Sequence, residues 1–211
     1  MRRAQRSASS LWPGAALLAF GFLASACATA RLPPPAPMVV EAARAAATYS
    51  ARLQVSLQAP GLRARTPALL AFRRPDALRV EIPGPSGARL VAVLSGGRLL
   101  AVFPGDRAFY QGAAGEAELQ ALLGLSLTPV EVMNVLVGAG SPRLLSYELQ
   151  WGPTLPRQVK AVLPDGARLT LRVEEAEVGG ALPAEAFVPP RHAGYRALPL
   201  EEARRLWARR L

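Results

Sequence analysis

Apolar and polar residues alternate with a period of two along much of this chain, which is typical of half-buried β-strands. The first alternating segment covers residues 52–58, and Pro60-Gly61 predicts a turn after it. Two further strands follow, whose apolar faces carry Ala68, Leu70 and Phe72, and then Leu78, Val80 and Ile82. Residues 90–94 and 99–103 are apolar at nearly every position, so both of their faces are expected to be covered. A short sixth strand is expected at Phe109-Tyr110.

The spacing of apolar residues becomes helical in the middle of the chain. Residues 116–123 place Leu119, Leu122 and Leu123 on one face, and Gly124 can end this helix. Thr128-Pro129-Val130-Glu131 is a capping box with proline at the first helical position. It predicts a second helix, which carries Met133 and Leu136.

Strands resume after these helices, at residues 145–151, 159–163 and 169–173, and Asp165-Gly166 predicts a hairpin between the last two. A helix is expected at each end, over residues 38–49 and 200–211. The basic final helix can either contact a membrane or partner, or pack Leu206 and Trp207 on the domain. This order predicts a mainly β (α+β) fold with a curled antiparallel sheet, covered by the two middle helices.

The first 26 residues have the features of a secretory signal peptide. Three arginines lie within the first six positions, and the apolar run over residues 11–24 is shorter than the roughly 20 residues that cross a bilayer. The run ends Leu23-Ala24-Ser25-Ala26-Cys27, which resembles a bacterial lipobox with its leucine one position early. That resemblance implies cleavage before Cys27, the only cysteine, and lipid on its sulfur. Ordinary secretion, with cleavage after Ala26 or Ala30, is the alternative.

Residues 27–37 are the lipidated N-terminus and a proline-rich tether. Ala28 stands where an aspartate would hold a lipoprotein at the inner membrane, so we expect a lipid anchor in the outer membrane with the domain facing the periplasm. The net charge is +10. Because export argues against nucleic acid, attraction to anionic lipid headgroups is the preferred explanation of this charge, with a merely solvated basic surface as the alternative.

Several motifs, in their order along the chain, resemble the LolA/LolB-like group of periplasmic lipoprotein carriers and receptors. They are the lipobox, Tyr49-Ser50-Ala51-Arg52-Leu53, Leu127-Thr128-Pro129-Val130-Glu131, Tyr147-Glu148-Leu149-Gln150-Trp151, Leu155-Pro156-Arg157 and the Asp165-Gly166 hairpin. The resemblance covers residues 46–188 and implies an unclosed half-barrel, in which helices form a lid over an apolar space that takes acyl chains. The half-barrel domain is then residues 38–190, followed by a C-terminal tail, residues 191–211, with a short basic helix.

Under this resemblance eight residues would line the apolar cavity, four from the sheet and four from the lid. They are Leu70, Phe72, Val80, Ile82, Leu119, Leu122, Met133 and Leu136. A solid core made of the same residues is the alternative, and it would suit a structural lipoprotein that supports an envelope assembly through protein partners. The loop Pro83–Gly87 lacks the large apolar tip of the corresponding loop in the receptor of the group. A related lipid-binding or envelope-assembly lipoprotein therefore stays open.

No catalytic pattern stands out along the sequence. His192 is the single histidine, which is too few for a histidine metal cluster, and no G-x-S-x-G elbow accompanies it. Glu174, Glu175 and Glu177 are interpreted as a solvated sheet edge rather than an acid–base or calcium site. We therefore expect a binding or structural protein, not an enzyme, with no cofactor and no metal.

Overall fold

The structure is a computed structural model that describes residues 35–59 and 62–209. Its strands follow the predicted alternation of apolar and polar residues, and its two middle helices lie where helical spacing predicts them. In chain order they are α1 (Pro37–Arg44), β1 (Thr48–Ala59), β2 (Leu62–Arg73), β3 (Ala77–Gly84), β4 (Gly87–Ser95), β5 (Arg98–Phe103), η1 (Pro104–Asp106), β6 (Ala108–Ala113), α2 (Glu116–Leu123), α3 (Pro129–Leu136), β7 (Ser146–Trp151), β8 (Pro156–Val162), β9 (Arg168–Val178), η2 (Ala184–Phe187), β10 (Arg196–Ala197) and α4 (Leu200–Ala208).

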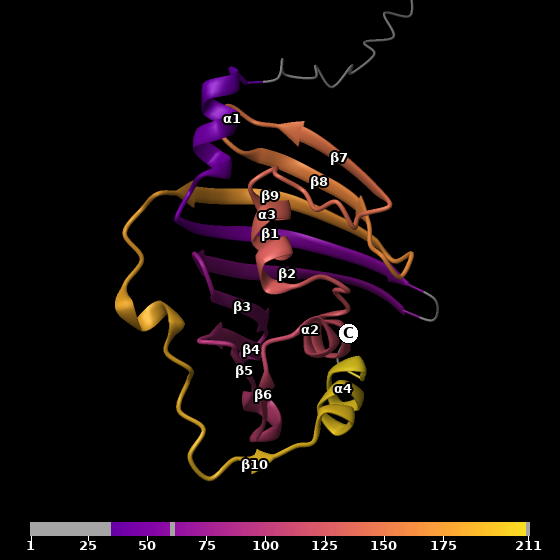
Figure 1. Ribbon diagram of the computed structural model, residues 1–211. Coiled ribbons are helices and arrows are strands. Elements are labelled where there is room, and N and C mark those ends of the chain that lie inside the picture. Colours follow the sequence, from indigo (N-terminus) through magenta and orange to yellow (C-terminus); the bar gives the residue numbers. More distant parts are fainter. Residues whose placement is uncertain (1–34, 60–61, 210–211) are drawn as a thin grey trace, which may run out of the picture. The chain divides into compact units, whose positions relative to one another are not determined.

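The strands of the described residues form one curled sheet that does not close into a barrel (Figure 1). Their order is β10-β6-β5-β4-β3-β2-β1-β9-β8-β7, and all neighbours are antiparallel except the two-residue β10, which runs parallel to β6. Helices α2, α3 and α4 lie on the inner side of the curl. The predicted fold class, a mainly β half-barrel with helices, is confirmed.

Strand register explains how the sheet obtains an apolar inner face. Leu57 of β1 lies opposite Ala64 of β2 and Leu169 of β9, and paired residues in an antiparallel ladder point to the same face. The next pair along the strands, Gln58 with Arg63 and Arg168, therefore points outwards. The inner side chains and the helices share one main hydrophobic core. Its buried members run from Ala43 to Trp207, so the whole main core lies within the compact unit Arg31–Leu211.

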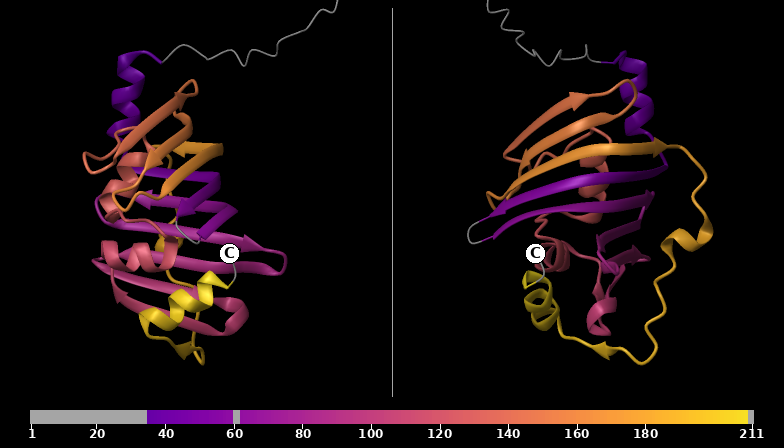
Figure 2. Two further views of the ribbon diagram at one scale, coloured as in Figure 1. Left: turned by 90° about the vertical axis from the view of Figure 1, so that its right-hand side faces the viewer. Right: turned by 180° about the vertical axis from the view of Figure 1, so that it is seen from behind.

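Both faces of β4 and β5 are buried, as their continuous apolar runs predict. Leu90, Ala92 and Leu94 belong to the main core, while Val91 and Val93 pack in a second cluster with Phe187 on the outer side. Phe187 belongs to η2, which lies against β3 and β4 within the long connection after β9 (Figure 2). This connection therefore supplies the cover that the outer faces of the central strands require.

Two predicted helices end differently from the sequence expectation. The helix predicted over residues 38–49 stops at Arg44, and Tyr49 lies in β1 opposite Phe72 of β2. The Tyr49 ring is buried and stacked on Phe72, with ring centroids 5.3 Å apart. Because this aromatic pair needs Tyr49 on the sheet, strand pairing overrides the helical spacing of the alanines. The predicted final helix ends at Ala208 rather than Leu211.

The segment predicted as a C-terminal tail packs on the domain over its described part. Strand β10 adds to the edge of the sheet beside β6, and α4 lies against α2. Trp207 is buried in the main core and Leu206 packs against it, so the apolar face of α4 is used inside the molecule. Of the two alternatives for this helix, packing on the domain is the one that the structure shows.

The signal segment, Cys27 and most of the tether lie outside the described residues. Within the described part of the chain, no helix combines the length and the apolar character needed to span a membrane.

Candidate functional site: an apolar cavity under the helices

An apolar cavity of about 90 Å³ lies between the inner face of the sheet and the helices. Its walls come from β1, β2, β3, β9, α2, the connection to α3, α3 itself and α4. The lining residues are Leu53, Val55, Leu57, Ala64, Thr66, Ala68, Leu70, Leu78, Val80, Ile82, Leu119, Leu123, Leu125, Leu127, Val132, Val135, Leu136, Leu169, Leu171 and Trp207. Thr66 and the indole of Trp207 bring the only polar side-chain groups in this set. The wall of the cavity is therefore almost entirely apolar.

The floor of the cavity follows from the alternation of the strands. Leu53, Val55 and Leu57 of β1 face inwards, and their partners on β2 and β9 continue the same surface. The partly exposed lining residues of the floor, Val55, Ala64 and Thr66, gather where β1 ends and β2 begins. On the lid side, Leu123 and Leu125 at the end of α2 are also partly exposed. The cavity therefore approaches the surface between the β1–β2 hairpin and α2.

The lid helices begin and end where local sequence signals predict. The N-terminus of α3 has a complete capping box: the Thr128 hydroxyl accepts from the backbone N–H of Glu131, and the Glu131 carboxylate accepts from the N–H of Thr128 at 2.9 Å. Helix α2 ends at Gly124, whose φ of 69° is the left-handed conformation that favours glycine. These two ends fix the connection that carries Leu125 and Leu127 into the cavity wall.

Polar contacts hold the lid helices against the sheet. The Arg74 guanidinium, in the turn after β2, donates to Asn134 Oδ1 on α3 at 2.9 Å. The Tyr147 hydroxyl of β7 donates to the backbone oxygen of Val135 at 3.0 Å, and burial raises the pKa of this hydroxyl. Both contacts tie the C-terminal end of α3, at Asn134 and Val135, to the sheet.

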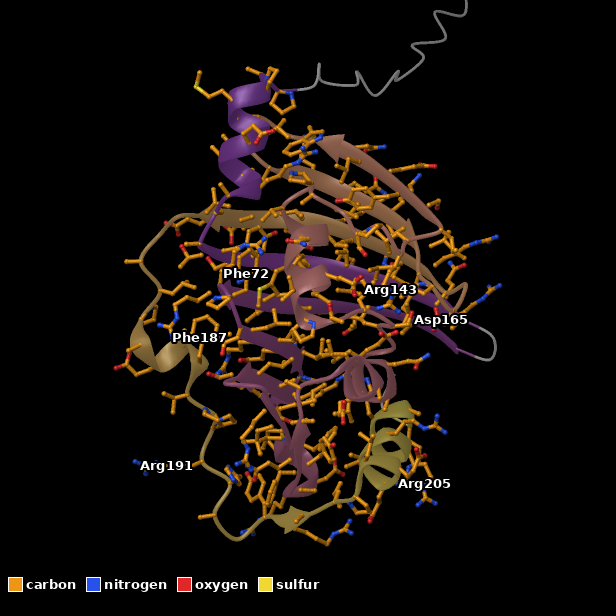
Figure 3. The ribbon with its side chains drawn as sticks, viewed as in Figure 1. Phe72, Arg143, Asp165, Phe187, Arg191 and Arg205 are labelled. Carbon is orange, nitrogen blue, oxygen red and sulfur yellow. The ribbon has the colours of Figure 1, made fainter. Side chains whose placement is uncertain are left out.

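Arg143, which is labelled in Figure 3, joins the starts of α2 and α3 through the carboxylates of Glu116 and Glu131. Its guanidinium forms a bidentate pair with Glu116 at 2.7 and 2.8 Å, and reaches Glu131 at 3.2 Å. Hydrogen bonds from Arg143 hold the pKa of the Glu116 carboxyl below its ordinary value. Burial opposes ionisation of Glu131, but hydrogen bonds from Ser141 and Thr128, together with Arg143, lower the pKa of its carboxyl. Both acids are therefore charged partners of Arg143 at neutral pH.

Five of the eight residues predicted for the cavity line it: Leu70, Val80, Ile82, Leu119 and Leu136. The other three, Phe72, Leu122 and Met133, are buried in the main core but do not reach the cavity. Phe72 stands at the far end of β2, where Tyr49 and the Arg74 guanidinium cover its ring. Leu122 precedes the lining residue Leu123, and Met133 follows the lining residue Val132. Because successive residues of a helix point about 100° apart, Leu122 and Met133 point away from the cavity.

Sequence reasoning missed lining residues of β1 and β9 and, above all, Trp207. The β1 and β9 residues could have been found from the same alternation that identified Leu70 and Val80. Trp207 carries the weaker signal of an apolar residue on one face of a short helix. An apolar helix face does not predict that α4 folds back over the cavity.

The remaining chemical candidates, His192 and the three glutamates of β9, lie outside the lining of the apolar cavity. His192 contacts the carbonyl oxygen of Pro190 through Nδ1 at 3.0 Å, and its ring lies against Phe109. Glu174, Glu175 and Glu177 belong to the part of β9 that extends beyond β8. Within residues 35–59 and 62–209, no group of three or more histidine, cysteine or acidic side chains could hold a metal ion.

Comparison with known proteins gives matches at the level of structure only. No family model matches the sequence, and no curated protein matches it. A crystal structure of a LolA superfamily protein from Nitrosomonas europaea is similar, at 11% identity and a TM-score of 0.43, over 74% of this chain and 99% of that one. A domain described as an outer-membrane lipoprotein-sorting protein, from Vibrio parahaemolyticus, is similar at 7% identity and a TM-score of 0.38, over 72% and 94%.

The first of these structures is described as a LolA superfamily protein, and the second as a lipoprotein-sorting domain. At these identities and TM-scores the likeness says nothing about a ligand.

Proposed function

We propose that this chain is a lipoprotein of the bacterial envelope that binds the acyl chains of a lipid or lipoprotein, as a carrier or acceptor. The observation that carries the proposal is the cavity, which is lined almost wholly by aliphatic side chains and roofed by three helices. Each methylene buried there would contribute about 0.8 kcal/mol, so ten methylenes would contribute about 8 kcal/mol before the cost of opening the lid. Binding of this kind needs no catalysis.

Acyl binding in this cavity would require the lid to move. Pockets for drug-sized ligands usually hold about 300–1,000 Å³, whereas this cavity holds about 90 Å³. An acyl chain would therefore enter only as α2, α3 or α4 moves away from the sheet. The small volume also favours a second candidate, a scaffolding lipoprotein with a solid core, and the two candidates differ in whether the domain takes up acyl chains.

The membrane attachment in this proposal rests on the sequence. Lipid on Cys27 would hold the domain at the membrane, and Ala28 after it favours the outer membrane with the domain facing the periplasm. Residues 27–36 would extend by roughly 3 Å each as a proline-rich tether, which allows a reach of about 30 Å. The full-length Cys27→Ser variant should leave the membrane fraction. If it stays there, another element is the anchor.

The test of acyl binding uses the segment from Arg31 onward, without its anchor. Mass spectrometry should detect acyl lipids that purify with it, and a fluorescent fatty acid should bind. Ala64→Trp places an indole at the partly exposed end of the cavity and should reduce probe binding, whereas Ala113→Trp, at an exposed position on β6, should not. Thermal unfolding confirms that both variants are folded. Absence of both co-purified lipid and probe uptake would rule out the acyl binder and favour the scaffold.

A further inference from the structure

The outer face of the sheet carries a cluster of basic side chains directly behind the cavity. Strand register places outward-facing residues of β2, β1, β9 and β8 in three rows. One row contains Arg63 and Arg168, the next contains Arg65 and Lys160, and the third contains Arg172. From strand spacing, these five residues lie within about 14 Å across the strands and about 13 Å along them. We call these five residues the basic face.

The basic face is exposed, and acidic residues lie at its borders rather than within it. All five of its side chains are exposed, and within the described part of the chain none of them takes part in a salt bridge. The residues between them on β1 and β9 are the uncharged Gln54, Ser56, Gln58 and Thr170. Acidic residues border it on two sides: Glu148 on the edge strand β7 continues the row of Lys160, and Glu174 and Glu175 follow Arg172 along β9. Charges of one sign, close together and unneutralised by the protein, favour an anionic partner.

We propose that the basic face binds the anionic phospholipid headgroups of a membrane surface. Four of its five residues are arginines, whose planar guanidinium groups suit phosphate oxygens. Repeated phosphates at a bilayer surface match several separate cations better than a single small anion would. The choice of a membrane as the partner rests on the proposed function, because the lipid anchor would hold the domain close to a membrane. The charge cluster itself does not depend on what the cavity binds.

Most of the basic face lies on strand segments that also line the cavity, on the opposite side of the sheet. On β2, Arg63 and Arg65 point outwards while Ala64 and Thr66, between and beside them, line the cavity. On β9, Arg168 and Arg172 flank the lining residues Leu169 and Leu171 in the same way. The strand ends that bind headgroups would therefore be the ones at which the cavity approaches the surface. A bound membrane would lie next to the route by which an acyl chain enters or leaves.

The experiment measures flotation of the anchor-free segment from Arg31 with phosphatidylcholine vesicles, with and without phosphatidylglycerol. We expect binding only to the anionic vesicles, and weaker binding as salt is raised, because salt screens the attraction. The double variant Arg65→Gln/Arg172→Gln should weaken vesicle binding on the order of 25-fold, since each cation near an anionic surface contributes about five-fold. Its thermal unfolding should match that of the parent protein.

The control removes the same charge elsewhere. Arg98→Gln/Arg191→Gln takes two exposed arginines from the β4–β5 hairpin and the late loop and should weaken binding by no more than a few-fold. Equal losses in the two double variants, or no binding of the parent protein to anionic vesicles, would overturn the proposal. Uptake of a fluorescent fatty acid, measured on the same variants, should be unchanged because the substituted side chains point away from the cavity. Acyl binding and headgroup binding can therefore fail separately.

Discussion

Gln120 on α2 donates a hydrogen bond of 3.2 Å to the Asp165 carboxylate in the turn between β8 and β9. This exposed contact joins a lid helix to the tip of a hairpin 45 residues away in the sequence. Helix α2 also supplies Leu119 and Leu123 to the cavity wall. The Gln120–Asp165 hydrogen bond thus connects a lid helix to the sheet, close to the place where the cavity approaches the surface.

Loss of the Gln120–Asp165 hydrogen bond should speed the entry of an acyl chain. In Gln120→Ala the lid keeps its apolar contacts but loses the hydrogen bond, so we expect faster uptake of a fluorescent fatty acid in stopped-flow measurements. Because the contact is exposed, the free energy of unfolding should change by no more than about 0.5 kcal/mol. Gln111→Ala, which removes an exposed glutamine on β6, is the matched control. An unchanged uptake rate would show that α2 is not the moving part of the lid.

Trp207 should be the largest single contributor of α4 to stability. Its side chain is 5% exposed, packs in the main core and lines the cavity. Truncation in Trp207→Ala removes these contacts and enlarges the cavity, which should lower the free energy of unfolding by about 3–5 kcal/mol in chemical denaturation. Arg205→Ala, exposed on the same helix, should change it by no more than about 0.5 kcal/mol. A small effect of Trp207→Ala would mean that α4 is docked only loosely.

Local sequence signals account for most of the fold and for part of the cavity. Alternation and turn residues identify the strands, and the capping box and Gly124 identify the ends of α3 and α2. Alternation decides which face a residue occupies, but not its depth along the strand. Leu70 and Phe72 share a face of β2, yet Leu70 lines the cavity while Phe72 lies beneath Tyr49. The return of α4 over the sheet depends on contacts between distant segments, which no local pattern encodes.

Acid should weaken the region around the start of α3. The pKa of Glu131 is lowered in the folded protein, so its contribution to stability is present above its unfolded pKa of about 4.5 and is lost as pH falls through the lower folded value. Glu131→Gln removes this contribution. It should cost about 1–3 kcal/mol at neutral pH, because Ser141, Thr128 and Arg143 lose a charged acceptor.

Urea denaturation of the parent protein and Glu131→Gln across this pH range provides the measurement. The difference in the free energy of unfolding should shrink as the pH falls below about 4.5. A difference that stays constant with pH would mean that the ionised carboxylate is not the source of the effect.

Alanine substitutions at two glycines of nearly equal φ should distinguish the cost of backbone strain from the cost of close packing. Gly138, after α3, has a φ of 80°, and Gly166, in the β8–β9 turn, has a φ of 83°. A Cβ added at Gly166 would meet no atom within 4 Å, whereas at Gly138 it would lie 2.7 Å from Trp151 Cζ2 and 3.2 Å from Pro156 Cγ. Gly166→Ala should therefore cost about 1 kcal/mol from the left-handed backbone alone, and Gly138→Ala about 1–3 kcal/mol more from overpacking. Chemical denaturation measures both losses, and equal values would show that the end of α3 can move away from β7 and β8 at little cost.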